Sequence, residues 1–171
     1  MKIESIKTQR LTIRGFTKED ALWAYSIWND TEMGEYLPDE AKEGIDEEYL
    51  KELEVLGEDK ECCYLIPVLK NSVQRVGTCS FMISEEQKIY DIAYCVHKDF
   101  WNQGYATEIA QGLINYARRQ GAEKVTIFVG QENLASNRVA VKFGGKIVSE
   151  STYRKKGTNV LMKDDKYEIL L

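Results

Sequence analysis

The sequence predicts one α/β domain of the α+β kind, over residues 1–171, with a mixed, mostly antiparallel sheet of about seven strands and about four helices. A chain of 171 residues, 43% of them apolar and 30% charged, can bury one ordinary core. Runs with strand or helix periodicity occur in the order strand, two helices, three strands, helix, strand, helix, two strands. Because a strand, helix, strand unit pairs its strands in parallel, we expect the sheet to be mixed.

The N-terminal part is expected to form one strand and two helices. The stretch "IESIKTQRLTIRGF" alternates polar and apolar residues, which is typical of a strand. In "TKEDALWAYSIWND", Thr17 can cap a helix that has one apolar face. That face comprises Ala21, Leu22, Ala24, Tyr25 and Trp28. A second helix, over residues 46–56, has leucines on one face and acidic residues between them.

Three β-rich runs follow, "CCYLIPVLK", "RVGTCSFMI" and "KIYDIAYCV", joined by "NSVQ" and "SEEQ", and this pattern predicts an antiparallel meander. An apolar helical stripe then runs from Ile109 to Ala117, and Gly121 can end that helix. The strand "KVTIFV", a short helix from Ala135 to Phe143 and the strands "KIVSESTYR" and "VLMKDDKYEILL" complete the chain.

Composition excludes several classes of protein. The net charge is −5 and no basic face is evident, so nucleic-acid binding is not expected. The N-terminal stretch has no long apolar run, so neither a signal peptide nor a membrane span is expected, and we predict a cytoplasmic protein. The four cysteines lack metal-ligand spacing and two are adjacent, which argues against a metal site or a disulfide framework.

The negative charge is concentrated in one span. Residues 39–61 contain eleven acidic and three basic residues, a local charge of −8, so the rest of the chain carries +3. Such a surface favours a cationic partner. The alternative is an ordinary solvated helix face.

The stretch "FWNQGYATE" (residues 100–108) connects a predicted strand to a predicted helix. Unpaired N–H groups at a helix N-terminus bind anions, and a glycine lets a phosphate approach the backbone. The stretch matches neither a Walker loop nor a dinucleotide-binding fingerprint. An ordinary turn is the alternative.

Three stretches together resemble the GNAT superfamily of acyl-CoA-dependent N-acyltransferases, in particular the branch that acetylates the N-terminal alanine or serine of ribosomal proteins. They are "QRLTIRGFTKEDA", "YDIAYCVHKDFWNQGYATE" and "ENLASNRVAVKFGG". The resemblance implies a GNAT fold with a splayed central strand pair, and acetyl-CoA as the cosubstrate.

The resemblance also implies cofactor-binding residues. The family's phosphate loop falls on residues 101–106, where Gly104 and Ala106 match the pattern and Trp101 departs from it. The splayed strand would pair with the pantetheine amides, and an asparagine would contact the cofactor from the other side. The implied set is Tyr94, Cys95, Val96, Asn102, Gln103, Gly104, Tyr105, Ala106, Thr107 and Asn133.

Two familiar catalytic residues of the family are not present, because Ala140 and Phe128 stand at their positions. In the ribosomal-protein branch a serine three residues after the asparagine is a proposed acid, and Ser136 stands there. It could instead satisfy helix N–H groups. For the base we compare Glu132, His97 and Asp91, and we select Asp91 on the central strand; a water chain without a base is the alternative.

The expected function is transfer of an acetyl group from acetyl-CoA to a primary amine by direct attack. The acceptor would be a protein N-terminus or a small cationic amine. The alternatives are a detoxifying acetyltransferase for polyamine- or aminoglycoside-like molecules and a non-catalytic acyl-CoA-binding module. The protein could be a monomer or a homodimer.

Overall fold

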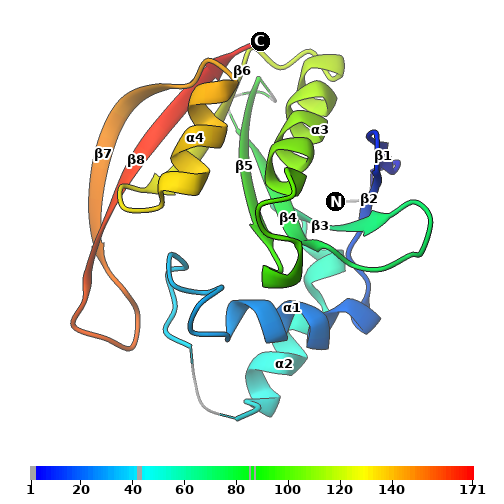
Figure 1. Cartoon of the computed structure of the whole chain (residues 1–171), viewed down its shortest axis with the longest axis vertical. Coiled ribbons are helices and arrows are strands. Elements are labelled where there is room, and N and C mark those ends of the chain that lie inside the picture. Colours follow the sequence, from blue (N-terminus) through cyan, green and yellow to red (C-terminus); the bar gives the residue numbers. More distant parts are fainter. Residues whose placement is uncertain (1–2, 42–43, 85, 87) are drawn as a thin grey trace.

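A computed structural model describes residues 3–41, 44–84, 86 and 88–171. Across these residues the strands form one sheet of eight, in the order β1-β2-β3-β4-β5-β6-β8-β7 (Figure 1). The strands after the first helices are β3 (Cys62–Leu69), β4 (Gly77–Ser84), β5 (Ile89–Val96), β6 (Lys124–Gly130), β7 (Lys146–Arg154) and β8 (Leu161–Leu170). The mixed, mostly antiparallel sheet is confirmed. The "SEEQ" connection includes residues 85 and 87, which lie outside the described residues.

The N-terminal strand was predicted as one element, and this is wrong. Two short strands, β1 (Ile6–Lys7) and β2 (Leu11–Gly15), form an antiparallel hairpin, which accounts for the eighth strand. The turn closes because Thr8 N donates to Leu11 O at 3.0 Å and Leu11 N donates to Thr8 Oγ1 at 3.0 Å. The hairpin brings Arg10 to the edge of the turn.

The helices lie on both faces of the sheet. They are α1 (Ala21–Trp28), α2 (Glu47–Glu54), α3 (Tyr105–Arg119) and α4 (Leu134–Lys142). Along β3, Cys63 and Leu65 pack in the core with α3, whereas Ile66 and Val68 pack in a second core with α1 and α2. Side chains of a strand alternate between its faces, so the two helix pairs cover opposite faces. Leu22, expected on the apolar face of α1, is exposed.

A buried ionic cluster ties the first short helical turn to the sheet. The carboxylate of Asp20 is fully buried and contacts Arg14 Nη1 at 2.6 Å and Arg75 Nε at 2.7 Å. Burial opposes ionisation, but the hydrogen bonds from both arginines outweigh it and lower the pKa of Asp20 to about 2.

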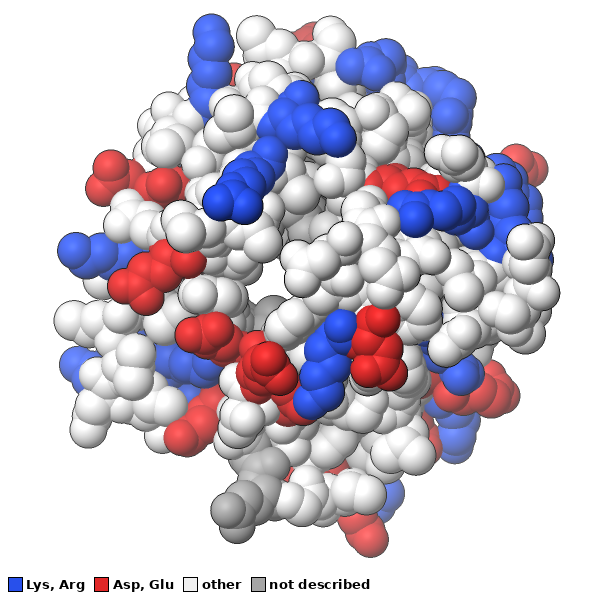
Figure 2. All heavy atoms as spheres, viewed as in Figure 1, with Lys and Arg blue, Asp and Glu red and all other residues white. Residues whose placement is uncertain are grey.

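The central strands β5 and β6 separate after three residue pairs. β5 pairs with β4 along its whole length, but it pairs with β6, in parallel, only through Ile89–Asp91 and Lys124–Thr126. β6 continues alongside β8 as far as Gly130. The predicted splayed strand pair is therefore confirmed, and we call the open wedge between β5 and β6 the fork. Figure 2 shows the α3–α4 face hollowed in its middle, between these two halves of the sheet.

None of the helices within the described ranges is both long and apolar enough to cross a membrane.

Candidate functional site

The loop between β5 and α3 is anchored by two aromatic side chains. Trp101 Nε1 donates to Val96 O at 2.7 Å, which ties the loop to the last residue of β5. Phe100 is buried and its ring meets that of Tyr105 edge-on, with centroids 5.7 Å apart. Trp101, the position that departs from the family pattern, thus holds the loop to the strand.

Gly104 immediately precedes α3 with φ +79°, a left-handed conformation in which glycine is unstrained. The first hydrogen bond of the helix runs from Glu108 N to Gly104 O at 3.1 Å. The N–H groups of Tyr105, Ala106 and Thr107 make no hydrogen bond within the described residues. Three free donors and the dipole of a 15-residue helix therefore converge at this turn, which suits an anion.

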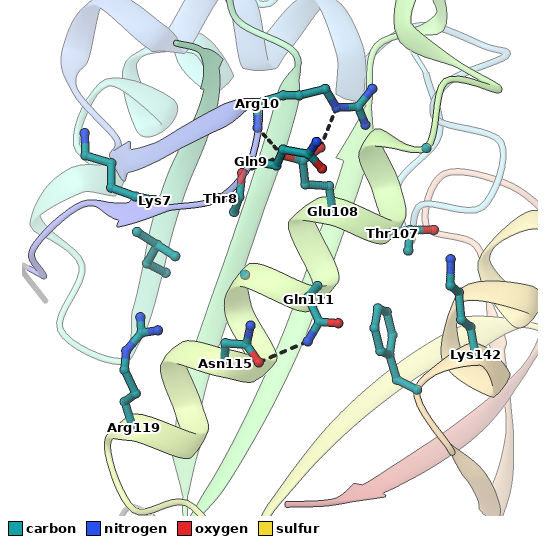
Figure 3. Close-up of a pocket in the computed structure, with 14 residues that line it drawn as sticks. Lys7, Thr8, Gln9, Arg10, Thr107, Glu108, Gln111, Asn115, Arg119 and Lys142 are labelled. Carbon is teal, nitrogen blue, oxygen red and sulfur yellow. Dashed lines mark hydrogen bonds and ion pairs between the residues drawn. The ribbon is translucent and has the colours of Figure 1, made fainter.

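A shallow groove of about 430 Å³ runs along the outer side of α3, beside the β1–β2 turn (Figure 3). Arg10 enters it from the turn and contacts Glu108, while Lys142 reaches over from α4 at the Thr107 end. Arg10 was not among the site residues predicted from the sequence. The missing signal was the turn at Thr8, which a continuous strand pattern conceals.

The edge of β5 that faces the fork carries free backbone groups. His97 N donates to Val76 O beyond β4, so by alternation the backbone groups of Val96 and Tyr94 face the open edge. Val96 O is occupied by Trp101, which leaves the N–H of Val96 and both groups of Tyr94. The backbone of Cys95 faces β4, and its thiol lies 3.7 Å from Met33 O on the α1 side.

The hydroxyl groups of Tyr94 and Ser136 meet across the fork. Their oxygens lie 2.9 Å apart, which joins β5 to the first turn of α4. Asn133 caps α4, because its Oδ1 accepts from Ser136 N at 3.1 Å. The Ser136 hydroxyl is thus engaged with Tyr94 rather than with helix N–H groups, and Asn133 retains its amide N–H groups.

Asp91 lies at the closed end of the fork, in the last residue pair between β5 and β6, opposite Thr126. Burial raises the pKa of its carboxyl, against the opposing effects of Lys166 and Thr126. It shares a strand face with Cys95, the face opposite Tyr94. Asp91 lies four positions before Cys95, about 13 Å along the strand. Asp91 and Ser136 therefore lie on opposite faces and at different depths.

The other two candidate bases have different surroundings. His97 stacks on Trp23, with centroids 4.8 Å apart, and its Nδ1 accepts from Asp99 N at 3.3 Å. Glu132 is exposed at the surface before α4. Within the described ranges, no group of three or more His, Cys, Asp or Glu side chains is placed to hold a metal ion.

An acidic pocket of about 340 Å³ lies on the α1–α2 face. Its polar lining includes the carboxylates of Asp39, Glu40, Asp46, Glu48 and Glu52 and one ammonium group, that of Lys156. The pocket adjoins the fork through Trp28, whose Nε1 donates to Thr78 Oγ1 at 3.0 Å. Thr78 lies directly opposite Cys95 in the β4–β5 pair. Residues 42–43 of the acidic span lie outside the described residues.

The segment between α1 and α2 completes the wall of the fork on the α1–α2 side. Tyr36 lies close to the end of β6, since a Cβ on Gly130 would lie 3.2 Å from its ring. Lys155, from the β7–β8 hairpin, holds the segment by donating to Gly34 O at 2.9 Å and to Glu35 O at 2.7 Å.

The sequence and the fold of this chain are both similar to those of known acetyltransferases. Residues 10–146 match the protein family described as Acetyltransferase (GNAT) domain. An N-acetyltransferase of Bacillus licheniformis called p20, itself uncharacterised, is 29% identical over 122 residues, which span 67% of this chain and 66% of that protein.

Two solved structures share the fold over nearly the whole chain. One, from Salmonella typhimurium, is described as modifying the N-terminal serine of the ribosomal protein L7/L12; it is 19% identical, with a TM-score of 0.78, over 98% of this chain and 99% of that one. The other is a spermidine N-acetyltransferase from Vibrio cholerae in complex with CoA and spermine. It is 15% identical, with a TM-score of 0.79, over 94% and 95% of the two chains.

Proposed function

The chain belongs to the GNAT acetyltransferase family, whose members are acetyl-CoA-dependent N-acetyltransferases, and from this premise we propose that it acetylates a primary amine of a cationic acceptor. One observation carries the proposal: the fork lies between a turn with free N–H groups at the start of α3, on one face of the sheet, and an acidic pocket on the other face. An anionic cofactor and a cationic acceptor would therefore meet in the fork from opposite faces.

The cofactor is proposed to bind along the turn and the open edge of β5. Its pyrophosphate would accept hydrogen bonds from the N–H groups of the turn between Asn102 and Thr107, with Gly104 leaving space for it. Its pantetheine amides would pair with the free backbone groups of Tyr94 and Val96, as an added strand does. The amide of Asn133 would contact it from the α4 side.

The acetyl thioester would then lie in the fork, between β5 and α4. A neutral amine attacks the carbonyl carbon, and a backbone N–H of β5 stabilises the oxyanion. The C–S bond breaks as the nitrogen–carbon bond forms, and the departing thiolate takes a proton from the hydroxyl of Ser136. Tyr94, hydrogen-bonded to Ser136, would hold that hydroxyl in place and replenish its proton.

Asp91 is the proposed base on the acceptor side. Because its pKa is raised, it can accept a proton nearer to neutral pH than an exposed aspartate can. Its depth in the fork implies that one or more water molecules relay the proton from the amine. The acid and the base would then act from opposite faces, which keeps their protons separate.

The acidic pocket supports a cationic acceptor. Glu40, Glu48 and Glu52 have no ion pair within the described residues, so their charges are available to a ligand. Trp28 and Tyr49 add aromatic surface to the same pocket, on which a cation can rest. A small polycationic amine fits this lining best. A protein N-terminus is the second candidate, favoured by the serine-modifying neighbour of the same fold.

The test is a thiol-release assay with acetyl-CoA and a matched panel of acceptors. The panel comprises spermidine, an aminoglycoside, peptides with N-terminal serine or alanine, and a neutral primary amine of similar size. We expect turnover to favour the polycations and to fall as salt rises, because exposed charge pairs are screened. Preference for the peptides would select the second candidate, and preference for the neutral amine would contradict the role of the pocket.

A further inference from the structure

The first family-like stretch, "QRLTIRGFTKEDA", has no role in the chemistry described so far. Its Arg10 lies at the β1–β2 turn, next to the phosphate loop, although 93 residues of sequence separate it from Gln103. The side chain is partly exposed, at 39%, and it lines the groove along α3 (Figure 3). Its guanidinium is thus available to a ligand at the turn.

Three contacts fix the orientation of the guanidinium. Nε forms an ion pair with Glu108 Oε2 at 2.6 Å, Nη1 donates to Gln103 O at 3.0 Å, and the plane lies over the Tyr105 ring at 4.0 Å. Glu108 is held in turn by Arg10 N at 2.6 Å and by Thr8 Oγ1 at 2.7 Å. The arginine therefore braces both the loop and the first helical turn.

The remaining nitrogen, Nη2, is unused. It makes no hydrogen bond in the part of the chain that the structure describes, and it lies 3.6 Å from the position that a Cβ on Gly104 would occupy. Because Gly104 has no side chain, this space is open. Nη2 and the free N–H groups of the turn border the same space.

We propose that Arg10 binds a phosphate of acetyl-CoA, with Nη2 donating to a phosphate oxygen while Nε and Nη1 hold the loop in its binding conformation. This inference rests on the proposed function, since it assigns a residue to the same cofactor site. A cation beside a helix N-terminus is unfavourable by itself, because the dipole is positive there. The carboxylate of Glu108 offsets part of that cost, and a phosphate placed between Arg10 and the N-terminus of α3 would offset more of it.

Two phosphate groups of the cofactor could occupy the space, the pyrophosphate and the 3′-phosphate. The groove that Arg10 enters is also lined by Thr107 and Lys142, so it extends beyond the turn. The chemistry of the contact is the same in both cases, an arginine N–H donating to an anionic oxygen. Acetyl donors that lack the 3′-phosphate, or both the 3′-phosphate and the pyrophosphate, can show which group Arg10 contacts.

The test compares Arg10→Gln with the wild type, using acetyl-CoA, acetyl-dephospho-CoA and S-acetylpantetheine. We expect the Kd for CoA, measured by calorimetry, and the KM for acetyl-CoA to rise about tenfold, as for one charge-assisted hydrogen bond, with kcat unchanged. Turnover of S-acetylpantetheine, which has no phosphate, should not change. An equal loss with both nucleotide donors assigns the pyrophosphate, and a loss confined to acetyl-CoA assigns the 3′-phosphate.

Arg119→Gln is the matched control, because Arg119 lines the same groove about 21 Å further along α3. Arg119→Gln removes the same charge and should leave the Kd for CoA, the KM for acetyl-CoA and kcat unchanged. Arg10→Lys keeps a cation for the ion pair with Glu108 but has no second nitrogen to donate to the phosphate. This variant should therefore fold and still bind CoA less tightly than the wild type.

Unchanged CoA affinity in Arg10→Gln, or an equal loss with S-acetylpantetheine, would overturn the inference. Failure of Arg10→Gln to fold, followed by wild-type affinity in Arg10→Lys, would overturn it too. Failure of the wild type to bind CoA would instead overturn the proposed function, so the two failures are distinguishable.

Discussion

A methyl group added at Gly104 should separate the cost to the fold from the cost to cofactor binding. With φ +79°, an alanine here adopts the left-handed conformation, at a cost of about 1–2 kcal/mol in stability. Its Cβ would lie 3.6 Å from Arg10 Nη2, an ordinary contact, so no clash adds to that cost. The same methyl group would occupy the space proposed for a phosphate.

The loss of affinity follows from the donors that the phosphate would no longer reach. Losing one charge-assisted hydrogen bond costs roughly 1.5–3 kcal/mol, which corresponds to an increase in Kd of about 10- to 100-fold. Calorimetry with CoA measures the Kd, and urea denaturation measures the free energy of unfolding.

Gly121→Ala is the control for Gly104→Ala. Gly121 lies just beyond the C-terminal end of the same helix with φ +81°, and a Cβ there would meet nothing within 4 Å. Both variants should lose similar stability, and only Gly104→Ala should lose affinity for CoA. Equal Kd values in the two variants would refute the phosphate-loop assignment.

Three further predictions concern other groups. In stopped-flow thiol release, Ser136→Ala should lower kcat about 100-fold with an unchanged Kd for acetyl-CoA, and Tyr94→Phe should lower kcat less. A wild-type kcat in Ser136→Ala would exclude Ser136 as the acid. In the wild type, the acidic limb of the pH–rate profile should lie above the ordinary pH range of an aspartate, because burial raises the pKa of Asp91. Asp91→Asn should abolish this limb. A limb that persists in the variant would exclude Asp91 as the base. The ionised carboxylate of Asp20, whose pKa is lowered to about 2, stabilises the fold by about 2 kcal/mol at pH values above its unfolded pKa, and this contribution should be lost as the pH falls from about 4 to 2. Urea denaturation of the wild type and of Asp20→Asn at pH 6 and pH 3 measures it. The same pH dependence of stability in both proteins would contradict this prediction.

Local signals predicted the order of the elements and the loop, because they depend on residues close in sequence. Gly104 was identified from its place between a strand and a helix, and the structure gives it the positive φ that favours glycine. The apolar stripe of α3 and the β-rich runs predicted the meander and the crossover. The splayed strands came from the resemblance rather than from periodicity.

Contacts between distant residues could not be predicted in the same way. The hairpin at Thr8 depends on a side-chain hydrogen bond within a pattern that reads as one strand, so the position of Arg10 beside the loop was not foreseen. The pairing of Tyr94 with Ser136 joins residues 42 positions apart, and only the packing of α4 against the fork brings them together. Such contacts are set by tertiary structure, which a single sequence does not reveal.

A crystal structure with coenzyme A bound would show whether the turn before α3 and the open edge of β5 hold the cofactor. We expect phosphate oxygens within hydrogen-bonding distance of the N–H groups of Tyr105, Ala106 and Thr107, and pantetheine along the open edge of β5, with its sulfur near Ser136. Coenzyme A bound elsewhere, or a fork left empty while the cofactor saturates the protein, would contradict this expectation.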